Sequence, residues 1–484
     1  MPGSTPGREF GRLPVQKNAE LAKLESDPIY HHRMRFLIWP ALLVAAGCSL
    51  LDPHNMIGRQ LGEATGIPTD PVPAPGNHPL DTTAREHAFD FVWATIDERY
   101  HDPAFNGVDW KAVGARYRPL ALAAPTDDAF WDVLDRMTGE LKDAHTRVES
   151  PARVALRQRD ESITLGFAFT PLEGRLAITS VNPESDAWWA GVRPGMSLVA
   201  IAGEPAGPAY QKLLADTRFD STDRSRHLRA LRRLLTGPDG STMAFTFERA
   251  DGTRFDAKLT RHRLTTRPSA SHRILPSGFG YLRLTQWTIG ATAHALEGID
   301  ALKDTPGMII DLRGNPGGSV HAVNSVLARF FTERADLGRV TTRTGRPVSL
   351  LFGTVEIIKL KSEVEGNKNA YKKPVVILLN AGSASGSELF AGEMQAANRA
   401  VVVGQPSCGC LLGFLGYTRI PGGGELAYSE VGFVLANGQK IEGRGVVPNH
   451  VVPLTVADLR LGRDRTLETA EEVLTTLVAN RPRG

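Results

Sequence analysis

The residues best suited to covalent chemistry lie in a turn of small residues, Gly382-Ser-Ala-Ser-Gly-Ser-Glu388. The five apolar residues 375–379 before this turn predict a strand buried on both faces, and the apolar residues of 389–394 predict one face of a helix. A hydroxyl at the start of a helix lies near the positive end of the helix dipole, where unpaired amides can stabilise an oxyanion. Ser385 is therefore a candidate nucleophile. A simple turn in which Ser387 caps the helix would explain the same pattern.

A second turn of the same build occurs earlier, where an apolar strand beginning at Gly307 runs into Asp311-Leu-Arg-Gly-Asn-Pro-Gly-Gly318. An amphipathic helix is predicted after it, over Val320–Phe331. Because glycine lets the backbone approach a ligand closely, Gly317 or Gly318 is expected to supply one oxyanion donor, and Gly386 the other. A tight turn or a phosphate-binding loop are the alternatives. Neither a Walker lysine nor a G-x-G-x-x-G pattern follows, which disfavours phosphate binding.

With these two turns in this order, the chain resembles the C-terminal-processing (tail-specific) serine peptidases and their tricorn-like relatives over roughly residues 85–470. The first turn described above resembles the family's nucleophile motif and the second its oxyanion motif. Gly280-Tyr-Leu-Arg-Leu284 resembles the strand that opens the catalytic domain, and Ile441-Glu-Gly-Arg-Gly-Val-Val-Pro448 the segment that closes it. The resemblance implies that Ser385 is the nucleophile.

The resemblance also indicates which residue acts as the base. Processing peptidases use a lysine downstream of the serine, but Cys410 stands at that position here. The tricorn-like branch uses a histidine in a Leu-x-Asp-x-His-Thr segment, which Leu141-Lys-Asp-Ala-His-Thr146 matches. His145 is therefore the expected general base, with an ordinary pKa near 6.5. His321, one turn into the helix after the oxyanion glycines, is the reserve candidate.

A base of this kind needs a group that holds its tautomer. Tricorn-like relatives place a catalytic glutamate just before a Gly-Val-x-Pro segment, and Glu442 matches it. In the tricorn pattern a serine beside the histidine relays this contact, whereas the neighbour here is Ala144.

The N-terminal region predicts an export signal. Residues 34–48 have a basic start, a short apolar stretch and small residues before Cys48, which is the pattern of a bacterial lipoprotein signal peptide. The apolar stretch is shorter than the ~20 residues that a membrane-spanning helix needs. Residues 1–33 are interpreted as an upstream extension, and the proline-rich residues 49–80 as a flexible linker. We expect lipidation of Cys48 and a periplasmic, lipid-anchored protein, with the outer membrane favoured. A cytosolic protein with an apolar N-terminal helix is the alternative.

Composition excludes other classes of function. A net charge of +3 over 484 residues gives no broad basic surface, so no nucleic-acid partner is predicted. Besides Cys48, the chain has only Cys408 and Cys410, which could form a disulfide or remain as two thiols. No zinc-site spacing is found, and neither a metal nor an organic cofactor is predicted.

The predicted fold class is α/β, with a crotonase- or ClpP-like catalytic core, an N-terminal helical domain and an inserted PDZ-like β domain. Leu165, Gly166 and Phe167 resemble the carboxylate-binding loop of a PDZ module, which binds a peptide as an added strand. A PDZ-shaped lid that only gates the active site is the alternative. Residues 207–236 form an arginine-rich insertion with no assigned role. The predicted domains are the helical domain 81–152, the PDZ-like domain 155–265, the catalytic domain 270–455 and the C-terminal helix 456–484.

These patterns predict a serine endopeptidase that cleaves polypeptides through an acyl-enzyme on Ser385. Two other classes remain open. One is an inactive peptide-binding scaffold with the same fold, and the other is a thiol enzyme that uses Cys410.

Overall fold

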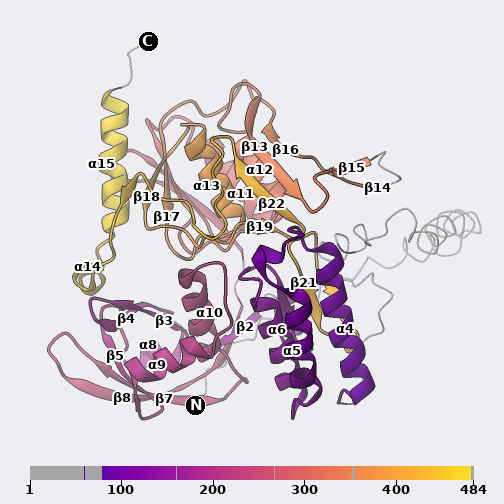
Figure 1. Cartoon of the computed structure of the whole chain (residues 1–484). Coiled ribbons are helices and arrows are strands. Elements are labelled where there is room, and N and C mark those ends of the chain that lie inside the picture. Colours follow the sequence, from indigo (N-terminus) through magenta and orange to yellow (C-terminus); the bar gives the residue numbers. More distant parts are fainter. Residues whose placement is uncertain (1–58, 60–78, 160, 266–267, 351–354, 481–484) are drawn as a thin grey trace, which may run out of the picture.

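The computed structural model describes residues 59, 79–159, 161–265, 268–350 and 355–480 (Figure 1). The predicted signal peptide, Cys48 and nearly all of the predicted linker lie outside these ranges. Arg59 belongs to that linker, and its guanidinium donates to the Gly416 carbonyl at 2.6 Å and to Glu430 at 2.7 Å. No helix within the described ranges is both long and apolar enough to cross a membrane.

The N-terminal region is helical, as predicted, and its three long helices have polar caps. Asp81, Asp109 and Thr126 accept hydrogen bonds from the first turns of these helices. Their apolar faces form one core with Leu426 and Tyr428 of the catalytic domain. The helices are α4 (Thr82–Arg99), α5 (Trp110–Leu122) and α6 (Asp127–Gly139), with a short 3-10 turn at Phe105–Gly107. Strand β1 (Arg147–Glu149) follows them and pairs with β21 (Glu425–Ala427).

Residues 167–260 form a separate antiparallel sheet with the order β3-β4-β5-β7-β8, in magenta in Figure 1, and the flanking strands β2 and β9 pair with each other. The predicted insertion folds as two helices, and the second, α10, packs Leu231 and Leu235 into the core of this sheet. The elements are α7 (Pro151–Arg157), β2 (Glu161–Thr164), β3 (Phe167–Leu172), β4 (Arg175–Val181), α8 (Asp186–Trp189), β5 (Ser197–Ile201), β6 (Glu204–Pro205), α9 (Ala206–Ala215), α10 (Asp223–Leu235), β7 (Thr242–Glu248), β8 (Arg254–Thr260) and β9 (His262–Thr265).

The catalytic domain is built on a sheet with the order β10-β11-β12-β17-β18-β23, parallel except for the β10–β11 pair. Val375 and Ile377 of β17 pack into the core formed with α11, α12 and α13, and Val376 packs toward α15 on the other face. Burial on both faces explains why this strand is continuously apolar. The elements are β10 (Ala270–Ile274), β11 (Gly280–Leu284), α11 (Ile289–Ala301), β12 (Met308–Asp311), α12 (Val320–Leu327), β17 (Val375–Leu379), α13 (Gly386–Ala396), β18 (Val401–Gly404), β23 (His450–Val451), α14 (Val456–Leu461) and α15 (Arg465–Ala479).

A second sheet, with the order β16-β13-β22-β19, lies against this core. It consists of β13 (Ala335–Thr342), β16 (Lys361–Val364), β19 (Leu412–Gly413) and β22 (Val431–Leu435), and small pairs are formed by β14 (Val348–Leu350) with β15 (Val355–Ile358) and by β20 (Thr418–Arg419) with β21. The prediction of an α/β protein with a helical N-terminal region is confirmed. The helix predicted over Val320–Phe331 ends earlier, at Leu327, because residues 328–330 form tighter turns that place Phe330 in the core.

Candidate active site

Ser385 lies at a strained junction between β17 and α13. It precedes the first residue of the helix and has φ 52° and ψ −116°, a conformation that residues with a side chain rarely adopt. Two acceptors hold it there, because its amide donates to the carbonyl oxygen of Cys410 at 3.1 Å and to Oε2 of Glu388 at 3.0 Å. Strained strand-to-helix turns of this kind can expose a serine hydroxyl as a nucleophile.

The glycine turn lies beside Ser385 because β12 and β17 are parallel neighbours and both turns leave from the same edge of the sheet. Gly317 has φ 99°, and a Cβ atom at this position would lie 2.6 Å from Cβ of Ser385 and 2.7 Å from the amide nitrogen of Gly386. Only a glycine permits so close an approach.

Two backbone amides next to Ser385 are free to bind an oxyanion. Among the described residues, neither the Gly318 amide nor the Gly386 amide donates a hydrogen bond, whereas the Gly317 amide donates to Oδ1 of Asn315 at 2.9 Å. A Cβ atom on Gly386 would lie 3.4 Å from the Gly318 nitrogen, so these two amides are close together. Of the two glycines predicted for the first donor, the structure therefore favours Gly318.

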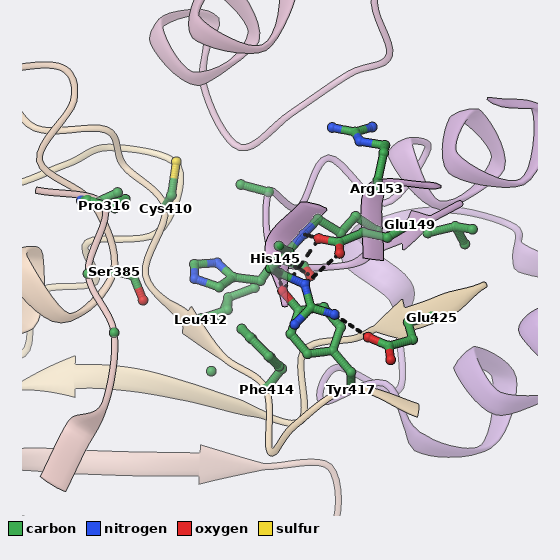
Figure 2. Close-up of a pocket in the computed structure, with 18 of the residues that line it drawn as sticks. His145, Glu149, Arg153, Pro316, Ser385, Cys410, Leu412, Phe414, Tyr417 and Glu425 are labelled. Atoms are coloured by element: carbon green, nitrogen blue, oxygen red, sulfur yellow. Dashed lines mark hydrogen bonds and ion pairs between the residues drawn. The ribbon is translucent and has the colours of Figure 1, made fainter. Parts of the chain in front are cut away.

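His145 lies on the loop after α6, and Asp143 fixes its backbone. The His145 amide donates to Oδ1 of Asp143 at 2.8 Å, and Oδ2 of Asp143 accepts from Ser429 at 2.6 Å. Figure 2 shows the His145 imidazole directed toward Ser385 across an open space. In the described part of the chain, no hydrogen bond joins the two side chains. Catalytic hydrogen bonds are often long in unliganded enzymes and shorten when substrate binds.

Burial changes the expected basicity of His145. The residue is 9% exposed, and desolvation lowers the pKa of its imidazole to about 4, with the charge of Asp143 opposing the shift and that of Arg147 adding to it. The expectation of a pKa near 6.5 is therefore wrong for this structure. His145 is neutral at pH 7, which is the form that can accept a proton.

Ser385 and His145 line the same cavity, which has a volume of about 3010 Å³. Gly317, Gly318 and Gly386 also line it. Pockets for small ligands usually have volumes of about 300–1,000 Å³, so this cavity has room for a polymer.

Glu442 lies behind the cavity and does not line it. Its Oε2 accepts from the Leu411 amide at 2.6 Å, and the Ser221 side chain lies close enough to influence the pKa of the carboxyl group. Burial, followed by the nearby charge of Asp143, raises the pKa of Glu442 well above its ordinary value. No hydrogen bond or ion pair joins Glu442 to His145. Of the three predicted catalytic residues, the structure therefore brings Ser385 and His145 to one cavity but does not connect Glu442 to them.

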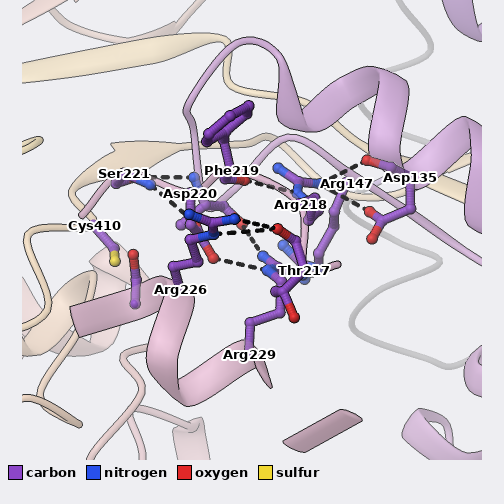
Figure 3. A network of polar contacts seen from close by, with 12 residues as sticks. Asp135, Arg147, Thr217, Arg218, Phe219, Asp220, Ser221, Arg226, Arg229 and Cys410 are labelled. Carbon is purple, nitrogen blue, oxygen red and sulfur yellow. Dashed lines mark hydrogen bonds and ion pairs between the residues drawn. The ribbon is translucent and has the colours of Figure 1, made fainter. Parts of the chain in front are cut away.

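Residues 216–222, between α9 and α10, connect the His145 loop to the loop that carries Cys408 and Cys410 (Figure 3). Arg218 donates to the Asp143 carbonyl at 2.9 Å, and the Ser221 hydroxyl accepts from the Ala144 amide at 2.9 Å. On the other side, Thr222 donates to the Cys408 carbonyl at 2.6 Å. The segment with no assigned role therefore holds the His145 loop against the loop that carries Cys408 and Cys410. Ser221 places a hydroxyl against the backbone of Ala144, the residue before His145, and lies near Glu442.

Comparison with known proteins assigns this domain to a family. Residues 278–452 match the peptidase family S41 domain, and residues 81–139 match the tricorn protease C1 domain. The chain carries a peptidase family S41 catalytic domain. S41 enzymes are serine-type peptidases, so the prediction that this chain is a serine-type peptidase is confirmed.

Two relatives that match most of the chain agree with this assignment. The chain is 26% identical over 382 residues to carboxyl-terminal-processing peptidase 2 of Arabidopsis thaliana chloroplasts, covering 75% of this chain and 68% of that protein. A Streptomyces coelicolor tricorn protease homolog is 25% identical over 431 residues, covering 84% of this chain, but the chain spans only 33% of that protein.

Two solved structures share the fold. The photosystem II D1 C-terminal processing protease has a TM-score of 0.53 and 23% identity, covering 81% of this chain and 98% of its own. Mature CPAF has a TM-score of 0.64 and 16% identity, covering 83% of this chain and 99% of its own.

Three polar residues of this site were not identified as site residues from the sequence: Asp143, Ser221 and Glu388. Glu388 is fully buried in α13 and accepts hydrogen bonds from the Ser385 amide, the Gly409 amide at 2.6 Å and the Cys410 amide at 2.9 Å. It therefore ties the nucleophile turn to the 407–410 loop, although burial raises its pKa. A carboxylate among the apolar residues that begin a helix was the signal that could have indicated this role.

Cys408 and Cys410 form a disulfide bond in this structure. The Cys410 sulfur is thus not a thiolate, which argues against the thiol-enzyme alternative. The site uses the backbone of Cys410, whose carbonyl accepts from the Ser385 amide and whose amide donates to Glu388.

We expect the double variant Cys408→Ala, Cys410→Ala to keep most of the peptidase activity, within about tenfold of wild type, because both backbone contacts survive the change. Peptide hydrolysis and inhibition by an alkylating agent are the measurements. Complete loss of activity in a variant that still folds, as judged by circular dichroism, would contradict this account.

The remaining predicted residues lie as follows. His321 is exposed in α12 and lines the same cavity, so it remains the reserve base.

Leu165 is buried, and its amide donates to the Leu235 carbonyl of α10 at 3.2 Å. His227 of α10 also lies 3.3 Å from the Phe169 carbonyl of β3, so α10 covers the free edge of β3. Peptide binding at Leu165, Gly166 and Phe167 stays a prediction, and it requires α10 to move.

Proposed function

We propose that this chain is a serine endopeptidase that hydrolyses polypeptides through an acyl-enzyme on Ser385. The observation that carries the proposal is the shared cavity in which a strained serine, a neutral histidine and two unpaired amides meet. A cavity of about 3010 Å³ is large enough for an extended polypeptide.

In the proposed reaction, His145 takes the proton of Ser385 Oγ as this oxygen attacks the carbonyl carbon of the scissile peptide bond. The amides of Gly318 and Gly386 donate to the oxyanion that forms, each contributing about 3 kcal/mol in comparable enzymes. Protonated His145 then gives its proton to the leaving amine as the C–N bond breaks. A water molecule then attacks the ester carbonyl as His145 takes its proton. When the ester C–O bond breaks, His145 returns this proton to Ser385 Oγ, which releases the acyl product and restores the free serine.

Glu442 is the proposed orienting carboxylate. Nδ1 of His145 and Oε1 of Glu442 are both buried, and neither has a hydrogen-bond partner among the residues that the structure describes. Such atoms destabilise a folded protein by about 1–3 kcal/mol each, so a contact between them on substrate binding would be favourable. Ser221 and Asp143 would guide this movement, because Ser221 holds the Ala144 backbone and lies near Glu442, and Asp143 holds the His145 backbone.

Incubation with a peptide library, followed by mass spectrometry of the products, tests the proposal directly. We expect internal cuts that are absent with Ser385→Ala protein prepared in the same way. Cuts that persist at the same rate in that variant would assign them to a contaminant or to another residue.

The pH profile reports the base. Because His145 must be neutral to accept a proton, kcat/KM is expected to stay nearly constant from pH 7 down to about 5 and to fall near its pKa of about 4. An acid limb near pH 6.5 would mean that the base is solvated or is another residue.

The lowered pKa of His145 also affects the free energy of unfolding. This free energy is expected to decrease as the pH falls from 6.5 toward 4, since only the unfolded chain binds the proton in this window.

We also propose that Cys48 is lipidated and that the enzyme is anchored on the periplasmic side of a bacterial membrane. The support is the sequence pattern of residues 34–48. Cys48→Ser should move the protein from the membrane fraction to the soluble fraction and block signal cleavage at Gly47. Mature protein that still contains peptides from residues 1–33 would contradict the proposed start at Met34.

A further inference from the structure

One wall of the active-site cavity is rich in arginine. It is formed by β1, α7 and α10, and Figure 2 shows Arg153 of α7 on this wall, beyond His145 as seen from Ser385. The lining arginines of these three elements are Arg147, Arg153, Arg157, Arg229, Arg232 and Arg233.

Most of these side chains already have partners. Arg147 and Arg157 pair with Glu149 at 3.2 Å and 2.7 Å. Arg229 pairs with Asp220 at 2.7 Å, and Arg233 donates to the Asp216 carbonyl at 2.8 Å. These four arginines therefore already use their charge or their N–H donors in contacts within the protein.

Arg153 and Arg232 are different. Across the described residues, neither guanidinium makes a hydrogen bond, an ion pair or a stacking contact with an aromatic ring, although both line the cavity and are exposed to its solvent. Asp132 also lines this region and is influenced by the charge of Arg153, but it forms no ion pair with either arginine.

Crowding of like charges makes this pair receptive to an anion. The guanidinium of Arg232 is exposed to the cavity, but the surrounding protein atoms still desolvate it, and together with the charges of Arg229, Arg153 and Arg147 they lower its pKa to about 10. A bound anion would relieve this repulsion, and guanidinium groups bind carboxylates through two parallel N–H donors.

We propose that Arg153 and Arg232 form a subsite for a carboxylate of the polypeptide substrate. This inference rests on the proposed peptidase function and deepens it. Because the arginine pair and Ser385 line one continuous cavity, a chain held at Ser385 can extend to the pair. A polypeptide offers a carboxylate from two sources, an acidic side chain away from the cut site or its own C-terminus.

Matched peptides test the subsite. A peptide cleaved by wild type is made with Glu or Gln at each position flanking the cut site, and each form is made with a free or an amidated C-terminus. We expect wild type to prefer one carboxylate-bearing form by about tenfold or more in kcat/KM. Arg153→Gln and Arg232→Gln should each reduce this preference without slowing cleavage of the neutral peptide.

The control is Arg159→Gln, since Arg159 is exposed just after α7 and does not line the cavity. A preference for Glu that survives amidation assigns the site to a side chain, and one lost on amidation assigns it to the C-terminus. Absence of any preference, or equal loss on charged and neutral peptides, would overturn the proposal.

Peptide binding is also measured with Ser385→Ala protein by fluorescence anisotropy, so that a failed subsite can be told from absent catalysis. If Ser385→Ala protein binds the carboxylate form preferentially and wild-type protein cuts no peptide, the subsite is retained and the peptidase function is rejected. Cleavage without any preference for the carboxylate form would retain the peptidase function and reject the subsite.

Discussion

Alanine at Ser385 is expected to reduce kcat for peptide hydrolysis by about 10⁴–10⁶-fold, and alanine at His145 by a similar factor. The two residues line one cavity, and the imidazole points toward the serine. Because Ser385 needs His145 to accept its proton, neither residue is expected to support acyl transfer without the other. The double variant is therefore expected to lose little more than either single variant. Steady-state kinetics on one cleavable peptide, for all four proteins, measure this directly.

The control for the base is His321→Ala, because His321 lines the same cavity from α12. That variant should keep nearly all of the wild-type rate. Near-normal hydrolysis by His145→Ala together with a large loss in His321→Ala would exchange the roles of the two histidines. Losses that multiply in the Ser385, His145 double variant would show that the two residues act independently.

Gly317→Ala is expected to reduce kcat/KM by about 10²–10³-fold and to destabilise the fold by more than ~1 kcal/mol. The added Cβ would lie 2.6 Å from Cβ of Ser385 and 2.7 Å from the Gly386 nitrogen, so the nucleophile and one oxyanion donor must both move. Peptide kinetics and thermal unfolding are the measurements.

Gly314→Ala is the matched control for this change. Gly314 belongs to the same turn and also has a positive φ, of 73°, but a Cβ there would meet no atom within 4 Å. We expect a cost of about 1 kcal/mol in stability and nearly full activity. If both variants lose activity equally, backbone strain explains the result, and the close packing of Gly317 against Ser385 does not matter for catalysis.

The parts of the site that depend on local pattern could be predicted from the sequence. The apolar runs that became β12 and β17 are strands buried on both faces, and their parallel pairing brings Gly317 and Ser385 together. The motif around His145 was sufficient to select one of 13 histidines that lines the same cavity as Ser385.

Contacts between distant segments were outside the reach of local pattern. Ser221 and Arg218 lie in an insertion without a recognisable motif, and only the folded chain shows that they hold the His145 loop. The pKa of His145 is also a property of the assembled site, because it is burial that lowers it to about 4. The disulfide between Cys408 and Cys410 was one of two states that the sequence allowed.

The central claim is that Ser385 is an activated nucleophile. Labelling of the purified protein with a fluorophosphonate probe, followed by peptide mapping, tests it most directly, since such a probe modifies a serine only where the site activates it. The account predicts one adduct, on Ser385, that forms much more slowly in folded His145→Ala protein. A folded wild-type protein that remains unlabelled, or that carries the adduct on another residue, would contradict it and favour a peptide-binding scaffold.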